Sequence, residues 1–233
     1  MLNIFAEHMR PPGNTLVPQS IAARLQQSIL CGALAPGAQL PSQRELSGQF
    51  GVSRASLREA ISMLATLGLV DIKPGLGVFV THPSGRVVPW RFPHAASARH
   101  VYQARLALEG TAAGLAATCA SAAALDEILA TVEDIDAALA RADLVAMTVA
   151  DAAFHDLVVR SAANPLIESM YRSARELMVE TQRAPMATHL RLAETVAEHK
   201  VILLALQARN PVAAAQAMRD HFCGSARRFG IPL

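Results

Sequence analysis

The sequence predicts a mainly α-helical protein with an N-terminal winged helix-turn-helix followed by a C-terminal antiparallel all-α bundle. Three observations support this. Apolar residues recur at helical spacing in three segments of residues 17–68, and two short strand-like runs follow them directly. Residues 83–97 hold several prolines and the only tryptophan, which is typical of a linker. From residue 98 onward the pattern is helical almost throughout.

Composition indicates a cytoplasmic protein. No apolar run approaches the length of a membrane span, although 52% of the 233 residues are hydrophobic. Residues 1–16, MLNIFAEHMRPPGNTL, lack a basic start followed by an apolar block, so we expect a flexible tail rather than a secretory signal. Cys31, Cys119 and Cys223 are odd in number and far apart, which favours a reducing compartment.

The net charge of +2 is too small to indicate a nucleic-acid partner by itself. The distribution of charged residues along the sequence is more informative. Residues 1–82 hold six Lys and Arg against four Asp and Glu, whereas the remainder holds fifteen of each. The excess positive charge therefore lies in the predicted winged helix.

The first predicted helix spans residues 17–31, with Ile21, Leu25 and Ile29 at helical spacing, and the glycines and prolines of CGALAPGAQLP end it. The second begins at Ser42, which has the S-x-x-E spacing of a capping box with Glu45. Two short helices joined by a tight turn are then expected, because a glycine turn leads into the third helix, RASLREAISMLATLG.

The strand-like runs LVDIK and VFVT are separated by PGLG, which predicts a two-stranded hairpin. Three helices and a hairpin make a winged helix-turn-helix, over residues 17–82. In the C-terminal domain, residues 98–233, we expect about six helices in an antiparallel bundle. The breaks between them are expected near Ser121, near Asp143, at Asn164 and Pro165, around APMATH (residues 184–189), and at Asn210 and Pro211.

Arginines at the start of the third helix suggest DNA reading. Arg54 and Arg58 lie one helical turn apart, away from the apolar face, where a recognition helix enters the major groove and arginine can bind guanine. The alternative is a solvated surface face, and the hairpin after the helix favours DNA. Further candidates for phosphate or groove contacts are Arg44, Ser53, Ser56 and Gly75.

Four polar residues interrupt apolar helical segments of the bundle. Asp151 and His155 are one turn apart in VADAAFHDLVV, while His199 and His221 lie on two later helices. A bundle can bring such side chains to one interior point, and three imidazoles with one carboxylate suit zinc, or else nickel or manganese. The alternatives are a salt-bridged pair, an acid/base pair, or isolated core and surface histidines.

The N-terminal segment LAPGAQLPSQRELSGQFGVSRASLREAISMLATLGLVDIKPGLGVFV closely resembles the DNA-binding domain of the GntR family of bacterial transcription regulators, over about residues 17–81. In that family the positions of Arg44, Arg54, Arg58 and Gly75 contact DNA. Gln43 departs from the glutamate that is usual there. We expect little effect, because Glu45 still supplies the capping carboxylate.

The pattern D-x-x-F-H, N-P-L, E-H-x-x-I-L-x-A-L and A-x-x-x-M-x-x-H resembles the FCD ligand-binding domain of the FadR-type branch, over roughly residues 98–225. The resemblance implies that Asp151, His155, His199 and His221 coordinate a metal ion. It also implies that Arg105 faces the cavity and binds an acidic effector. The alternative for Arg105 is a surface ion pair with Glu109, worth about 0.2 to 0.5 kcal/mol.

The function that this predicts is a ligand-responsive transcription regulator, not an enzyme. It would bind a palindromic operator DNA as a homodimer and sense a small organic acid beside a divalent metal, zinc first. One rival is a metal-dependent hydrolase of small carboxylate esters or amides, because an open zinc site also activates water. Another is a helical adaptor, which would show no DNA retention even at low salt.

Overall fold

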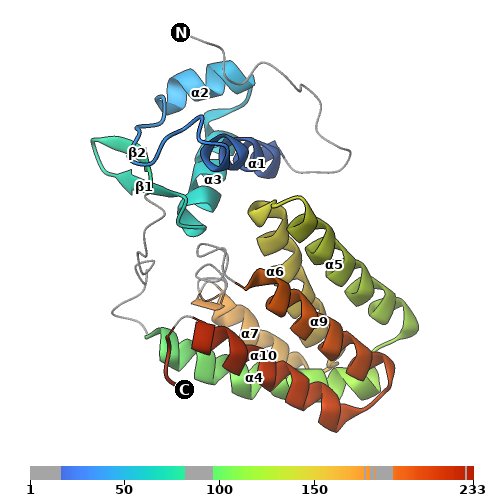
Figure 1. Cartoon of the computed structure of the whole chain (residues 1–233). Helices are drawn as coiled ribbons and strands as arrows, with labels where there is room; N and C mark the ends of the chain where they lie inside the picture. Colours follow the sequence, from blue (N-terminus) through green and yellow to red (C-terminus); the bar gives the residue numbers. More distant parts are fainter. Residues whose placement is uncertain (1–16, 82–96, 176, 179–180, 182–190, 229) are drawn as a thin grey trace. The chain divides into compact units, whose positions relative to one another are not determined.

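The computed structural model describes residues 17–81, 97–175, 177, 178, 181, 191–228 and 230–233. The chain divides into two compact units: residues 1–88 together with 143–146 form the first, and residues 89–142 together with 147–233 form the second. Figure 1 shows the elements of both. The expected tail (1–16), most of the expected linker (83–96) and the expected break at residues 184–189 lie outside the described residues.

Three helices form the body of the first unit: α1 (Val17–Leu30), α2 (Gln43–Phe50) and α3 (Arg54–Thr66). Helix α3 packs against both α1 and α2. The apolar residues with helical spacing face inward, as expected, because their burial stabilises the fold. The fully buried side chains of this core include Leu25, Leu46, Leu57, Ile61 and Leu64.

The predicted capping box is present at the start of α2. The Ser42 backbone N–H donates to Glu45 Oε2 at 2.8 Å, and the Glu45 N–H donates to Ser42 Oγ at 3.2 Å. Gly51, at φ 66°, ends α2 in the left-handed region. Ser53 then caps α3, accepting from the Ser56 backbone N–H. These local signals fix where the helix-turn-helix bends, and the Gln43 departure leaves the cap intact.

The wing is an antiparallel pair, β1 (Val70–Lys73) and β2 (Gly77–Val80), with Val70 opposite Val80 and Lys73 opposite Gly77. Pro74 and Gly75 occupy the turn, Gly75 has φ 74°, and the Leu76 N–H donates to the Lys73 carbonyl at 3.0 Å. A proline followed by a positive-φ glycine is the signature of a type II turn.

A segment that sequence patterns did not assign to the sheet runs beside β2. Its backbone pairs with β2 through Gly37, Ala38 and Leu40, and Gln39 bridges to Phe79. The Gln39 side chain also donates from Nε2 to the Leu76 carbonyl at 2.8 Å. The wing is therefore anchored to the chain that leads into α2.

Gly77 is expected to tolerate no side chain. It has φ 124°, and an added Cβ would overlap Gln39 Nε2, the atom that donates to the Leu76 carbonyl. We expect Gly77→Ala to lower the free energy of unfolding by more than about 1 kcal/mol, because alanine is strained at positive φ. Urea unfolding and hydrogen–deuterium exchange of peptides from the wing measure this.

The matched control is Gly48→Ala in α2, where an added Cβ meets nothing within 4 Å. There alanine is expected to stabilise by about 0.5 to 1 kcal/mol, because it removes backbone freedom from the unfolded chain. A Gly77→Ala variant whose wing exchanges as slowly as the wild type would contradict the described turn.

Among the described residues, six helices lie wholly or mainly in the second unit, α6 from Met147 onward. They are α4 (Ala98–Cys119), α5 (Ala122–Ala140), α6 (Leu144–Ser161), α7 (Pro165–Ser173), α9 (Leu192–Gln207) and α10 (Pro211–Arg228). Helix α10 packs along α4 and α9, and α9 also packs on α5 (Figure 1). Gly114 allows a close approach of α4 to α10, since a Cβ there would lie 3.2 Å from the Pro211 carbonyl oxygen. The predicted fold class is confirmed.

The helix breaks fall where the sequence places capping residues. Ser97 caps α4, Ser121 caps α5, and Asn164 caps α7 with Pro165 at its first turn. Asp143 accepts from the Ala146 N–H near the start of α6, and Asn210 accepts from the Ala213 N–H near the start of α10. Polar side chains at these positions satisfy backbone donors that the first helical turn leaves free.

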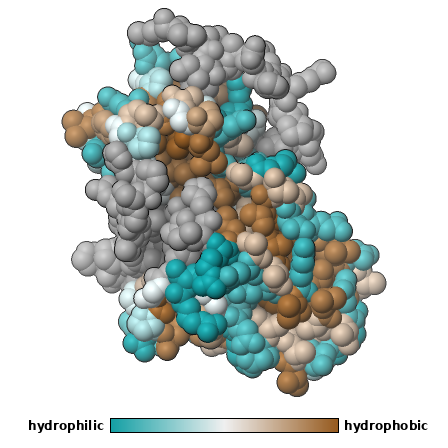
Figure 2. All heavy atoms as spheres, viewed as in Figure 1, coloured by the Kyte–Doolittle hydropathy of each residue, from teal (hydrophilic) through white to brown (hydrophobic). Residues whose placement is uncertain are grey.

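On the face shown in Figure 2, hydrophobic and hydrophilic residues are interspersed over the second unit. The exposed large apolar side chains include Val201 and Leu204 on α9 and Val212 on α10. Among the described helices, none is both long enough and apolar enough to cross a membrane.

Candidate functional site

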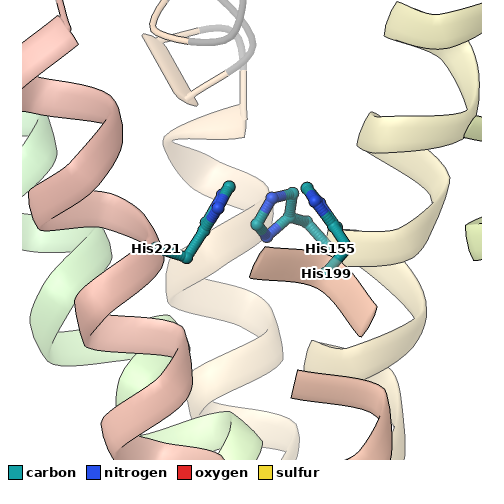
Figure 3. Close-up of side chains that lie close together, drawn as sticks. All are labelled: His155, His199 and His221. Carbon is teal, nitrogen blue, oxygen red and sulfur yellow. The ribbon is translucent and has the colours of Figure 1, made fainter. Parts of the chain in front are cut away.

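Three histidines from three helices meet inside the bundle. His155 on α6, His199 on α9 and His221 on α10 are all buried, and each offers a ring nitrogen within 4.8 Å of the others (Figure 3). Nε2 of His155 makes no hydrogen bond within the part of the chain that the structure describes. Leaving a buried ring nitrogen without a partner is costly, so a ligand for that atom is expected.

Asp151, one turn before His155 on α6, lies on the same side of the rings. Its Oδ1 is 3.2 Å from His199 Nε2, and its Oδ2 is 4.0 Å from His155 Nε2. Burial alone would raise the pKa of Asp151, but the three neighbouring histidines outweigh it and hold the pKa below its usual range. The four residues singled out in the sequence are thus brought together.

The second ring nitrogen of each histidine lies beside a protein oxygen, through a hydrogen bond for His199 and His221 and through an ion-pair contact without hydrogen-bond geometry for His155. These partners lie on the Nδ1 atoms, which leaves the Nε2 atoms for the shared interior point. The partners are Glu109 Oε2 for His155 at 2.6 Å, the Thr195 carbonyl oxygen for His199 at 2.7 Å, and Glu198 Oε2 for His221 at 2.9 Å. Such outer partners orient metal-binding histidines, so the arrangement fits a divalent ion bound through Nε2.

Arg105 on α4 is buried and paired. Its Nε lies 2.6 Å from Glu109 Oε1, its Nη1 donates to Thr181 Oγ1 at 3.0 Å, and its guanidinium lies 4.3 Å from the centre of the Phe222 ring. The ion pair with Glu109 therefore exists, but it is buried with His155 rather than on the surface. Burial would raise the pKa of Glu109, yet Arg105 and His155 lower it to about 2.

His221 is supported by a second arginine–glutamate–histidine series of contacts, like that of Arg105, Glu109 and His155. Arg228 at the end of α10 donates to both oxygens of Glu198, from Nη1 at 2.7 Å and from Nη2 at 2.8 Å. Burial lowers the pKa of His221 to about 4, against the opposing effect of Glu198. At neutral pH the ring is uncharged, which is the form that binds a metal ion.

Sequence reasoning did not assign four of these supporting groups: Glu109 as a partner of His155, and Thr195, Glu198 and Arg228. The sequence did hold a signal for the two glutamates, because each lies next to, or one helical turn from, a residue that was already a candidate. Glu198 precedes His199, and Glu109 follows Arg105 by four positions. Which histidine each glutamate contacts depends on how the helices cross.

The candidate DNA-contacting residues lie on the helix-turn-helix and the wing. Arg44, Arg54 and Arg58 are exposed, and Gly75 is exposed at the wing turn. Arg54 and Arg58 form no ion pair with any residue that the structure describes. Ser53 Oγ accepts from the Ser56 N–H at 3.1 Å and lies 2.9 Å from Ser56 Oγ. Both serines thus fix the start of α3, and the two arginines remain available to a partner.

Comparison with known families decides the assignment. The FCD domain model matches residues 100–223, and the model for bacterial regulatory proteins of the gntR family matches residues 18–80. The chain belongs to the GntR family of bacterial regulatory proteins. It is a transcription regulator with a C-terminal FCD domain, so the predicted family is confirmed.

Relatives agree with this assignment. The regulator is 31% identical over 210 residues to the uncharacterised HTH-type transcriptional regulator YcbG of Bacillus subtilis, covering 89% of this chain and 87% of that protein. It is 27% identical to the HTH-type transcriptional repressor NanR of Citrobacter rodentium, covering 91% and 85%. A GntR regulator structure from Rhodococcus sp. RHA1 matches in fold, with a TM-score of 0.53, 23% identity, and coverage of 93% and 99%.

Proposed function

We propose that this GntR-family regulator binds operator DNA as a homodimer and responds to a small organic acid, which it senses beside a metal ion in the FCD domain. The FadR-type motifs of that domain support this branch of the family. The observation that carries the proposal is the convergence of three buried histidines from three helices, beside Asp151. Members of the family are regulators rather than enzymes, which favours a sensing role for such a centre.

Asp151, His155, His199 and His221 are the residues that would hold the ion. Three neutral imidazoles and a carboxylate are ligands that zinc accepts readily, and nickel or manganese remain alternatives. A bound ion of this kind offers open positions to an oxygen ligand. The outer partners on the Nδ1 atoms support metal ligation over three separate core histidines, because each of the three rings turns its Nδ1 to a protein oxygen.

Arg105 supports an acid as the effector. Its guanidinium is buried in contact with Glu109, which itself contacts His155, so a positive charge and the candidate metal ligands lie within one polar cluster. Arginine binds carboxylates through two parallel hydrogen bonds, and a metal binds a carboxylate or hydroxyl oxygen. A hydroxy- or keto-carboxylate, or a sugar acid, satisfies both groups at once.

A metal-dependent hydrolase of esters or amides remains the rival function. It needs a base on the side of the metal, to take a proton from water. Glu109 and Glu198 lie on the opposite, Nδ1 side of their histidines and are paired with Arg105 and Arg228. We therefore expect no metal-dependent turnover of carboxylate esters or amides by the zinc-loaded protein, and such turnover would favour the rival.

The proposed DNA contact is tested at the recognition helix. We expect Arg54→Ala and Arg58→Ala each to cost about 1 to 3 kcal/mol of specific binding, as lost arginine–guanine contacts do. Folding should be unaffected, because both side chains are exposed. Fluorescence anisotropy at physiological salt measures this, with an operator selected from random DNA by the wild-type protein.

Arg44→Ala is the matched control, since Arg44 lies on α2 and is expected to contact phosphates. It should weaken binding to operator and random DNA about equally and reduce the salt dependence. If Arg54→Ala and Arg58→Ala both kept full operator affinity, α3 would not be the recognition helix. If even low salt gave no DNA binding by the wild type, the adaptor alternative would be favoured.

A further inference from the structure

Glu109 lies between the two halves of the proposed site. It is fully buried on α4, with Oε1 2.6 Å from Arg105 Nε and Oε2 2.6 Å from His155 Nδ1. One carboxylate therefore serves both the arginine proposed to bind an acid and a histidine proposed to bind a metal. The inference that follows rests on the proposed function.

Three of the five N–H donors of Arg105 are already engaged, one on each of its nitrogens. Its Nε and Nη2 point at Glu109, at 2.6 and 3.4 Å, and its Nη1 donates to Thr181. Either pair of nitrogens that could grip an incoming carboxylate includes Nη2. An acid that binds Arg105 must therefore share the guanidinium with Glu109 and weaken that ion pair.

Weakening this ion pair has a consequence at His155. A carboxylate whose charge is less compensated attracts the Nδ1–H of the ring more strongly across the 2.6 Å contact, and this raises the basicity of the ligating Nε2. Removing the arginine's pull on Glu109 thus favours the metal-bound form. We propose that Glu109 is a positioning residue that couples the acid and the metal, so that each binds more tightly in the presence of the other.

The contacting side chains of Arg228, Glu198 and His221 provide an internal comparison. They have the same chemistry, with Glu198 contacting His221 Nδ1 at 2.9 Å and held by Arg228 through two hydrogen bonds. Among the described residues, no hydrogen bond or ion pair joins Glu198 to Arg105. Loss of Glu198 should weaken metal binding while leaving any effect of Arg105 unchanged.

The test uses the full-length protein and the metal alone. Affinities for Zn²⁺ and Co²⁺ are measured by competition with a chromogenic chelator, and the visible spectrum of bound Co²⁺ reports the geometry around it. We expect Glu109→Gln to weaken binding by about tenfold to a hundredfold, as loss of an outer partner does. Arg105→Met, which imitates an arginine withdrawn from Glu109, should tighten it by about threefold or more.

The double variant Arg105→Met with Glu109→Gln separates two explanations. If Arg105 acts through Glu109, Arg105→Met has no effect in the Glu109→Gln background but keeps its effect in the Glu198→Gln background. If Arg105 only repels the cation through space, Arg105→Met tightens metal binding in both the Glu109→Gln and the Glu198→Gln backgrounds. The double variant removes both buried charges, and so it also tests Glu109 should the single variant Glu109→Gln not fold.

The outcomes distinguish this inference from the proposed function. A wild-type protein that binds neither metal overturns both. Metal binding by the wild type, with Glu109→Gln binding as tightly, overturns the role of Glu109 alone. The role of Glu109 is also overturned if Arg105→Met still tightens metal binding in the Glu109→Gln background.

Discussion

Replacing His199 with alanine is expected to remove bound metal and to lower the melting temperature of the protein. An ion that binds only the folded state stabilises it by about 2.7 kcal/mol when its free concentration is a hundredfold above Kd. His199 supplies the only ligand from α9 in the proposed set, and its Nε2 faces both Asp151 and the other rings. Losing it should disconnect α9 from the centre. His221→Ala is expected to act in the same way from α10.

Alanine at this position also leaves a cavity. The His199 ring lies 4.5 Å from the centre of the Phe154 ring, and its Nδ1 lies 2.7 Å from the Thr195 carbonyl oxygen. Packing losses persist without metal, whereas the metal's contribution vanishes in a chelator. The informative quantity is therefore the difference in melting temperature between the metal-loaded and chelated forms, which should be large in the wild type and near zero in His199→Ala.

His100→Ala is the matched control, since His100 is exposed near the start of α4. It should keep both the bound metal and the difference in melting temperature. Metal analysis of the purified protein gives a direct count. A wild type holding less than about a tenth of an equivalent, even after reconstitution with zinc, nickel or manganese, would rule out the metal centre.

Features that depend on neighbouring residues in the chain could be predicted. The capping box of Ser42 and Glu45, the Asn164 cap with Pro165, and the turn at Gly75 each involve residues within one helical or hairpin turn. Pairing beyond the hairpin could not be predicted, because it depends on residues that are distant in the sequence. The segment around Gln39 pairs with β2, and nothing in its own sequence indicates that.

In the candidate site, too, the residue types could be predicted from the sequence, whereas the contacts between helices could not. A carboxylate and histidines are conspicuous in apolar helices, so Asp151 and the three histidines could be singled out from the sequence. The spacing of Arg105 and Glu109 offered a surface ion pair as the alternative to the cavity role. It did not indicate that the pair is buried, because i,i+4 spacing does not say which face is covered. Contact of Glu109 with His155 requires α4 and α6 to meet at those residues, and this depends on packing of the whole bundle.

A hydroxy- or keto-carboxylate, or a sugar acid, is expected to raise the melting temperature of the metal-loaded wild type and to change its operator affinity. Both effects have one cause. An effector alters DNA affinity only if it binds the two conformations of the protein unequally, and typical coupling is about 1 to 3 kcal/mol, or about 5- to 150-fold. Thermal shift with an acid panel, followed by anisotropy with operator DNA, measures the two effects.

Both responses should diminish in Arg105→Ala, which loses the carboxylate grip, and in His155→Ala, which loses a metal ligand. Arg99→Ala is the matched control, because Arg99 lies on the same helix but is exposed. It should respond as the wild type does. A neutral amide or alcohol analogue of each active acid should have little effect, since it offers Arg105 no charge.

The two variants should fail for different reasons, and this makes the prediction specific. Arg105→Ala is expected to retain the metal while losing the response to acid, because Asp151 and the three histidines are untouched. His155→Ala is expected to lose both. If a broad acid panel left the metal-loaded protein unchanged while a neutral compound shifted its melting temperature and operator affinity, Arg105 would be only the buried counter-ion of Glu109. The protein would then be a regulator whose effector is not an acid.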